Sequence, residues 1–261
     1  MKIVTFNIRC VYDGKYDGIN SFIHRALFIA DKIKSEKPDV IGFQEINEKN
    51  LAALELVLPD YLFVGQLRGP EYDGEGLYTA IRKETCSLIG LETIWLSPTP
   101  HVPASRFECQ SEYPRICTAT KIRHKESGRI FRVFNIHLDH VSDEARVLGI
   151  KAAVSFMNKF DDNAPAILLG DFNAHPESET IRFCNENSKL IDVTKNIKAT
   201  FHNFFRQGIS FDYSESALAK IDYIYMSPEL ADITSSVNIW DDSKHGIYLS
   251  DHYPILAEIN F

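Results

Sequence analysis

The alternation of hydrophobic and polar positions predicts two similar units along the chain, each made of a strand, a helix and a second strand. Apolar runs bounded by polar or turn residues indicate the four strands, which we place at Lys2–Asn7, Val40–Glu45, Ile130–His137 and Ala166–Asp171. Apolar residues at helical spacing indicate the two intervening helices, Ser21–Lys37 and Asp143–Phe160. Two such units favour an α/β fold in which two packed sheets carry helices on their outer faces.

The remaining segments predict one more helix and several short strands. Leu51–Leu58 has the character of a helix and is ended by Pro59. The expected strands are Tyr61–Gly65, Leu77–Arg82, Cys86–Leu96, Cys117–Arg123, Ile221–Met226 and His252–Ile259. Many strands and few helices favour a layered α/β sandwich over an all-parallel barrel. Because no linker or charge block divides the sequence, we expect a single domain over residues 1–261.

Composition and charge narrow the classes of function. The chain is 44% hydrophobic and 25% charged, as in an ordinary globular protein, and no apolar run approaches the ~20 residues that span a bilayer. The N-terminus shows no apolar core of a secretory signal, so we expect a cytoplasmic protein. The net charge of −8 weighs against non-specific binding of duplex DNA, because an acidic surface does not attract phosphates.

The cysteines predict neither a disulfide framework nor a Cys-rich zinc site. Their number, five, is odd, and no two are spaced as Cys-x-x-Cys. We therefore expect all of them to be free thiols without a chemical role.

Polar residues stand at the strand ends, where ligand sites form in α/β proteins. The run ILLGDFN (167–173) ends on Asp171 and Asn173, and the period of two along a strand places both on one face, with Phe172 on the other. Other strands end or begin with Asn7, Glu45, His137, Asp222, Asp251 and His252. If the late strands run antiparallel to the early ones, all these side chains meet at one rim. Each alone is most simply a turn or surface residue, but together they favour a site.

The gathered groups fit metal-assisted hydrolysis of a phosphoester. Asn7, Glu45 and Asp251 offer the hard oxygen ligands that suit Mg²⁺ or Mn²⁺. Asp171 would orient or deprotonate a water molecule, and Asn173 would donate a hydrogen bond to a developing oxyanion. These parts together are those of a divalent-metal-dependent phosphoesterase.

The histidines admit two interpretations. His252 beside Asp222 would form an orienting acid–histidine pair in which the pKa of the imidazole is raised. A zinc hydrolase is the alternative, with ligands from His137, Asp139, His140, Asp171, His175 and His252. The segment HLDH lacks the tighter H-x-H-x-D-H form, and no cysteine or histidine bridge accompanies it, so oxygen-ligated metals fit better.

At these residues the sequence resembles the endonuclease/exonuclease/phosphatase superfamily, whose fold is that of DNase I. The matching segments occur in the family's order along nearly the whole chain: TFNIR (5–9), FQE (43–45), NIHLDH (135–140), GDFN (170–173), KIDYIY (220–225) and SDHYP (250–254). The resemblance implies a four-layer α/β sandwich and divalent-metal-dependent cleavage of phosphodiesters or phosphomonoesters. NIHLDH, with WLSPTP (95–100) and TFHNF (200–204), is similar to a bacterial-type group of metal-dependent hydrolases in this superfamily.

Carried over position by position, the resemblance implies a role for each site residue. The family's metal ligands correspond to Asn7, Glu45 and Asp251. Its water-orienting and transition-state residues correspond to Asp171 and Asn173. Its two acid–histidine pairs correspond to Asp222–His252 and Glu75–His137, and its phosphate contacts to Arg9 and Arg115. A histidine at 137 is nearer to the DNase I, sphingomyelinase, inositol-phosphatase and deadenylase branches than to the abasic-site nucleases.

The substrate is left open by these motifs. The loops expected to select it are Val11–Ile19, Arg68–Gly76, Ser97–Glu112 and Thr200–Ala219, whose aromatic residues would stack a base or a sugar, or pack as lids. The acidic charge favours a small phosphorylated metabolite or a single-stranded nucleic acid over duplex DNA. We expect a monomer. A module that binds phosphate ligands without catalysis is a further alternative, although every expected catalytic position is filled.

Overall fold

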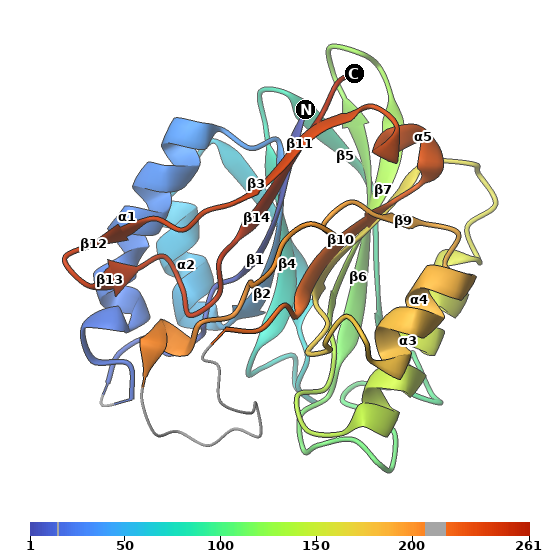
Figure 1. Ribbon diagram of the computed structural model, residues 1–261, viewed down its shortest axis with the longest axis horizontal. Coiled ribbons are helices and arrows are strands. Elements are labelled where there is room, and N and C mark those ends of the chain that lie inside the picture. Colours follow the sequence, from blue (N-terminus) through green and yellow to red (C-terminus); the bar gives the residue numbers. More distant parts are fainter. Residues whose placement is uncertain (15, 207–217) are drawn as a thin grey trace.

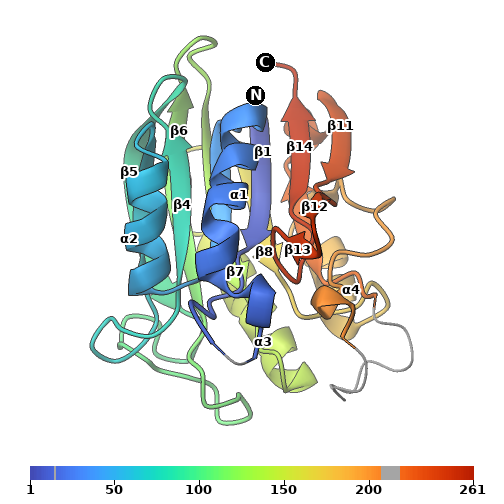
Figure 2. The same ribbon diagram turned by 90° about the vertical axis from the view of Figure 1, so that its left-hand side faces the viewer.

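The structure is a computed structural model that describes residues 1–14, 16–206 and 218–261. In these residues, two large β-sheets pack face to face and helices cover both outer faces (Figure 1). On one side lie α1 (Phe22–Glu36) and α2 (Glu48–Val57), and on the other α3 (Asp143–Met157) and α4 (Glu179–Asn187). The view turned by 90° shows α1 and α2 in front of the first sheet (Figure 2). This is the four-layer α/β sandwich expected from the sequence.

The first sheet contains the first predicted strand–helix–strand unit. Its strands are β1 (Lys2–Asn7), β2 (Val40–Ile46), β3 (Tyr61–Leu67), β4 (Gly76–Arg82), β11 (Thr234–Ile239) and β14 (Ile255–Ile259). They lie in the order β11-β14-β1-β2-β4-β3. β1 and β2 are parallel and α1 connects them, whereas the other neighbours pair antiparallel.

The second sheet contains the second unit, in which α3 connects two parallel strands, β7 and β8. Its strands are β5 (Cys86–Trp95), β6 (Ile116–His124), β7 (Ile130–His137), β8 (Ala166–Asp171), β9 (Ile191–Asp192) and β10 (Asp222–Met226). They lie in the order β5-β6-β7-β8-β10-β9. β10 pairs antiparallel with β8, so β10 begins at the rim where β8 ends.

Short elements complete the described chain. They are the 3₁₀ helices η1 (Gly18–Asn20) and η2 (Asn203–Phe205), the helix α5 (Pro228–Ala231), and the hairpin of β12 (Ser243–Lys244) and β13 (Ile247–Tyr248). No helix among the described residues is both long enough and apolar enough to cross a membrane.

Local side-chain bonds explain where the element boundaries differ from those predicted. α2 begins at Glu48, three residues before the expected start, because Asn47 and Asn50 form a reciprocal capping box. β14 begins at Ile255 and not at His252, since Pro254 has no N–H to donate and His252 instead forms a bridge with Phe201. α4 and β11 were not predicted; α4 begins after Ser178, whose hydroxyl accepts a hydrogen bond from the backbone N–H of Ile181.

Burial on both faces of β8 explains the uninterrupted apolar run that leads to Asp171. Ile167 and Leu169 pack between the sheets, whereas Leu168 and Phe172 pack in the layer beneath α3 and α4. Each such buried side chain stabilises the fold by roughly 1.5–3 kcal/mol. The strand is thus fixed from both faces, and its end holds Asp171 at a defined place.

Candidate active site

Strand ends from both sheets meet at one rim of the sandwich. In the second sheet, the register places His137 of β7 opposite Asp171 of β8, and Asp171 opposite Asp222 of β10. The other members of the rim are Asn7 at the end of β1, Glu45 in β2, and Asp251 and His252 in the segment before β14. The antiparallel course of β10 and β14 therefore brings the predicted side chains to the same edge as the ends of β1, β2, β7 and β8.

The amide of Asn7 connects the two sheets. Its Nδ2 donates to Oε1 of Glu45 at 3.0 Å and to Oδ2 of Asp171 at 2.9 Å. Its Oδ1 accepts from the backbone N–H of Arg9 at 3.0 Å. Asn7 is 1% exposed, so one buried amide holds two carboxylates from different sheets close together.

Glu45 reaches this position through an irregularity in β2. The register between β2 and β4 shifts between Phe43 and Ile46, and Glu45 has a left-handed φ of 59°. A bulge of this kind turns a side chain out of the regular alternation. Burial raises the pKa of the Glu45 carboxyl, but the charge of Arg9 and the donation from Asn7 outweigh it and lower the pKa to about 2. Glu45 is therefore an anion at neutral pH.

Asp171 lies at a turn that is also a wall of the site. Its Oδ1 accepts from the backbone N–H of Asn173 at 2.8 Å, and Asn173 has a left-handed φ of 49°. The strand alternation expected to place both residues on one face therefore ends at Asp171, and Asn173 is directed by the turn. The amide of Asn173 donates to the carbonyl of Leu138 at 3.1 Å. Gly170 precedes the turn because a Cβ there would meet the carbonyl oxygen of Ile136 at 1.9 Å.

His252 is fixed between two carboxylates. Its Nδ1 lies 2.9 Å from Oδ2 of Asp222, and its Nε2 lies 3.8 Å from Oδ2 of Asp171. Burial alone would lower the pKa of His252, but the charge and hydrogen bond of Asp222 raise it well above its ordinary value. The pKa of Asp171 is also raised, by burial and by the neighbouring charge of Asp222. The structure thus forms the expected Asp222–His252 pair and directs it at Asp171.

His137 lies on the other side of Asp171, with its Nε2 at 3.5 Å from Oδ2 of the carboxylate. Burial and the nearby charges of Arg115 and Arg68 lower its pKa well below the ordinary value, which favours a neutral ring. Among the described residues, no hydrogen bond or ion pair is found for the expected pairing of His137 with Glu75. Glu75 is held instead by Arg68, whose Nη2 lies 2.5 Å from Oε2, and by the thiol of Cys10, which donates to Oε1 at 3.1 Å.

Asp251 faces Arg9. Oδ2 of Asp251 lies 3.6 Å from Nε of Arg9, and Oδ1 accepts from the hydroxyl of Ser250 at 3.1 Å. Arg9 also pairs with Asp17 at 3.1 Å and has a side chain that is 30% exposed. The expected metal ligand and the expected phosphate contact are therefore adjacent to each other at the rim.

Arg115 is buried, and only part of its hydrogen-bonding capacity is used. Its Nη2 lies 2.9 Å from Nδ1 of His140, and its Nε lies 3.8 Å from Oδ2 of Asp139. Nε and Nη1 have no hydrogen-bond partner, and the side chain is 4% exposed. Burial and the charge of Arg68 lower its pKa to about 10.

The donor set fits a hard divalent cation. Glu45, His137 and Asp171 place one ligand atom each within 4.8 Å of one another, and so do Asp171, Asp222 and His252. Each group contains two carboxylates and one imidazole, so carboxylate oxygen is the more frequent donor. Carboxylate-rich sets of this kind suit Mg²⁺ or Mn²⁺.

The structure does not support the zinc alternative. Within the described residues, each of the two groups around Asp171 holds a single histidine. Asp139 is occupied by the backbone N–H groups of Val141 and Ser142 and by Ser111, and His140 by Arg115. The polar residues of the HLDH segment therefore have different partners and do not form one tetrahedral centre.

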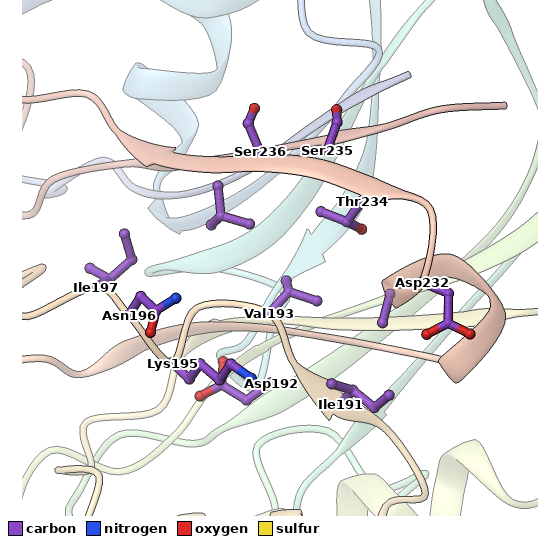
Figure 3. Close-up of a pocket in the computed structure, with 12 residues that line it drawn as sticks. Ile191, Asp192, Val193, Lys195, Asn196, Ile197, Asp232, Thr234, Ser235 and Ser236 are labelled. Carbon is purple, nitrogen blue, oxygen red and sulfur yellow. The ribbon is translucent and has the colours of Figure 1, made fainter.

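A separate cavity lies away from this rim, between the 191–197 segment and β11 (Figure 3). It has a volume of about 340 Å³, and none of the rim residues lines it. Asp192 at its wall is already held by Lys220 at 3.2 Å and by the backbone N–H of Thr194 at 2.7 Å. The cavity therefore has no part in the chemistry of the rim.

Arg25 supports the site and was missed from the sequence. This fully buried residue of α1 donates to the backbone carbonyls of Ile8 and Arg9, each at 2.9 Å, and of Leu249 at 2.6 Å. Its Nε donates to the carbonyl of Asn20 at 2.6 Å. The available signal was an arginine on the apolar face of a helix, three positions after Phe22 and four before Ile29.

The predicted specificity loops are only partly described. Lys15 in the 11–19 loop and residues 207–217 in the 200–219 loop lie outside the described residues. The described ends of these loops meet, because Asp17 pairs with Arg206 at 2.5 Å and with Arg9 at 3.1 Å. The signal for this contact, an acid in one loop and an arginine in the other, is too common to have been recognised.

Comparisons with known proteins agree with this fold. An endonuclease/exonuclease/phosphatase from Bacteroides vulgatus is 29% identical and superposes with a TM-score of 0.87, covering 99% of this chain and 98% of that one. The mannosyl-6-phosphatase of Bacteroides thetaiotaomicron is 25% identical, with a TM-score of 0.85 over 100% of both chains. The uncharacterized protein L388 of Acanthamoeba polyphaga mimivirus is 23% identical over 235 residues, 86% of this chain and 80% of that protein.

The fold and the acid–histidine rim define a phosphoesterase of the DNase I-like class. The chain belongs to the Endonuclease/Exonuclease/phosphatase family, whose sequence profile matches residues 4–252. The resemblance seen in the short motifs is thus confirmed for the family, whose members are hydrolases acting on phosphoester bonds.

Proposed function

We propose that the protein is a Mg²⁺- or Mn²⁺-dependent phosphoesterase that acts on small phosphorylated metabolites. The observation that carries the proposal is the position of Asp171. Its Oδ2 accepts from Asn7 and lies within 3.5 Å of His137 Nε2 and 3.8 Å of His252 Nε2. A buried carboxylate between two imidazoles is placed to orient a water molecule and accept its proton.

Glu45 and Asp251 would hold the cation, with Asn7 beside them. A bound divalent cation would supply Lewis-acid polarisation of the phosphoryl oxygen. The charge of Arg9, next to Asp251, would complement a non-bridging oxygen of the phosphate.

The remaining residues of the chain provide orientation and electrostatic stabilisation. Asp222 holds the His252 ring by Nδ1, so that Nε2 is directed at the reacting centre. The backbone N–H of Asn173 fixes Oδ1 of Asp171, and Oδ2, which also accepts from Asn7, would contact the water. Asn173 would also contact the developing charge, since its side chain lies in the same turn.

A phosphomonoester of a sugar is the first substrate class to test. The Bacteroides thetaiotaomicron relative is named a mannosyl-6-phosphatase and matches over the full length of both chains. The net charge of −8 supports a small substrate over a nucleic-acid backbone.

The test is a panel of phosphoesters incubated with EDTA-treated protein before and after addition of Mg²⁺ or Mn²⁺. The panel holds hexose phosphates, glycerol 3-phosphate, nucleoside monophosphates, bis-p-nitrophenyl phosphate and a single-stranded oligonucleotide. We expect cation-dependent release of inorganic phosphate from hexose phosphates, reduced about 10²–10⁴-fold in Asp171→Asn. Asp162→Asn, a change at the surface remote from the rim, is the matched control and should retain activity.

Turnover that persists in EDTA, or none with any ester, would contradict the proposal. Tight binding of phosphate without turnover would instead support the non-catalytic binding module.

A further inference from the structure

The turn that begins at His202 is bound directly to the peptide of Asp251. The backbone N–H groups of His202 and Asn203 donate to the carbonyl of Asp251 at 2.9 and 3.1 Å. Next to it, Phe201 forms a bridge with His252, and the centroids of their rings lie 4.9 Å apart. The 201–205 segment is therefore part of the wall of the proposed active site.

This turn holds an unfavourable backbone conformation. Asn203, Phe204 and Phe205 have left-handed φ values of 44°, 52° and 55° in succession. Residues other than glycine rarely adopt positive φ values, and residues with bulky side chains adopt them less often still. Such conformations persist where surrounding contacts hold them, and they concentrate at ligand-binding sites.

The conformation presents Phe205 on a stack of rings. Phe205 is 46% exposed, and its ring is stacked on that of His202, with 5.0 Å between the centroids and 27° between the planes. His202 is fully buried and stacks in turn on Tyr253 at 4.3 Å. The His202 ring is stacked on those of both Phe205 and Tyr253, so this imidazole acts here as a flat packing surface. The ring of Phe205 is thus held by the ring of His202, while much of its remaining surface is exposed to solvent.

A second connection fixes the far side of the turn. Arg206 pairs with Asp17 at 2.5 Å, Asp17 pairs with Arg9 at 3.1 Å, and Arg9 lies 3.6 Å from Asp251. Phe205 therefore stands between two links to the same aspartate. Leu56 on the outer helix α2 is exposed as well, and single exposed apolar residues are ordinary features of protein surfaces.

We propose that Phe205 is a specificity-determining residue that stacks against a ring in the substrate's leaving group. The inference rests on the proposed function, because it concerns how the protein recognises the leaving group of a phosphoester substrate. An aromatic face suits the flat face of a nucleobase and the C–H face of a sugar alike. His202 is a positioning residue, which acts through Phe205.

The experiment compares KM and kcat of wild type, Phe205→Ala and Phe205→Tyr for three monoesters. These are a hexose 6-phosphate, a nucleoside 5′-monophosphate and the ring-free glycerol 3-phosphate. Stacking of one ring corresponds to roughly a two- to twelvefold change in affinity. We expect Phe205→Ala to raise KM by that factor for a ring-bearing ester with little change in kcat, and to leave KM for glycerol 3-phosphate within about twofold.

The variants distinguish stacking of Phe205 against the substrate from a purely structural role of this side chain. Phe205→Tyr keeps the ring and should retain the wild-type KM, and Leu56→Ala is the control for loss of an exposed apolar side chain. If Phe205→Ala raises KM for the hexose ester alone, the ring that stacks on Phe205 is a sugar. If it raises KM for the nucleotide alone, that ring is a nucleobase. Equal changes for all three esters, or none, would overturn the inference while leaving the phosphoesterase proposal intact. A wild-type protein without cation-dependent turnover would overturn both.

Discussion

Nδ2 of Asn7 donates to Oδ2 of Asp171 at 2.9 Å, and this hydrogen bond joins two residues that are 164 positions apart and lie in different sheets. The same Nδ2 donates to Glu45. The reacting groups of the proposed phosphoesterase are therefore positioned by the packing of the two sheets against each other and not by either sheet alone.

Loss of this amide should impair both activity and stability. In Asn7→Ala, the buried carboxylate of Asp171 and the partly buried one of Glu45 lose a common donor, which costs about 1–3 kcal/mol in the free energy of unfolding. We expect kcat to fall by about 10²–10³-fold, the usual effect of removing one positioned hydrogen-bond donor. Urea unfolding and steady-state kinetics measure the two effects. Asn187→Ala, at an exposed position of α4, is the control and should change neither.

Removal of the Arg25 guanidinium should destabilise the whole protein. Arg25→Leu would leave the carbonyls of Ile8, Arg9 and Leu249 without their buried donor, and we expect the free energy of unfolding to fall by at least about 1–3 kcal/mol. Thermal or urea unfolding measures this loss. Arg182→Leu, an exposed arginine in α4, should change it by less than about 0.5 kcal/mol. Equal stability of the two variants would show that Arg25 does not hold the backbone on either side of the rim.

The ion pairs of Asp162 should make a small, pH-dependent contribution to stability. The hydrogen bonds from Lys121 and then Arg132 lower the pKa of Asp162 below its ordinary value of 3.8. A carboxyl whose pKa is lowered by folding stabilises the protein above its unfolded pKa, and this stabilisation is lost as the pH falls through the folded pKa. Asp162→Asn should therefore destabilise the protein by about 0.2–1 kcal/mol at pH 7, and by progressively less below about pH 4. A difference that grows on acidification would contradict this assignment.

The cysteines should differ in reactivity. All five are free, and burial raises the pKa of Cys86 to about 11 and of Cys184 to about 12, and that of Cys117 further. Because the thiolate is the reactive form, these three should react with a disulfide reagent only after unfolding. The partly exposed Cys109 should react first in the native protein. Rapid modification of Cys117 without loss of structure would contradict the buried position of β6.

The position of Asp171 was predictable because two simple patterns coincide there. An apolar run of three residues can be buried on both faces, and the polar residues that follow it mark its end. The meeting of these groups at one rim rested on the assumption that the late strands run antiparallel to the early ones, which the pairing of β10 with β8 and of β14 with β1 confirms. The four-layer arrangement was expected from the resemblance of the short motifs to a known superfamily.

Other features depend on local backbone geometry that residue patterns do not encode. Glu45 points to the rim only because β2 bulges and adopts a left-handed φ of 59° there. Glu75 was expected to pair with His137, and the structure shows its carboxylate accepting a hydrogen bond from Arg68 at the other end of the same loop. The left-handed turn that ends at Phe205 was also not predictable, since none of its residues is a glycine.

The measurement that tests the central claim most directly is the rate of phosphoester hydrolysis by EDTA-treated protein as Mg²⁺ or Mn²⁺ is added back, with wild type and Asp171→Asn measured in parallel. We predict that wild-type activity is absent in EDTA, saturates as the cation is added, and is about 10²–10⁴-fold lower in the folded Asp171→Asn variant at every cation concentration. Wild-type activity that does not depend on the cation, or equal activity of the two proteins, would contradict the account.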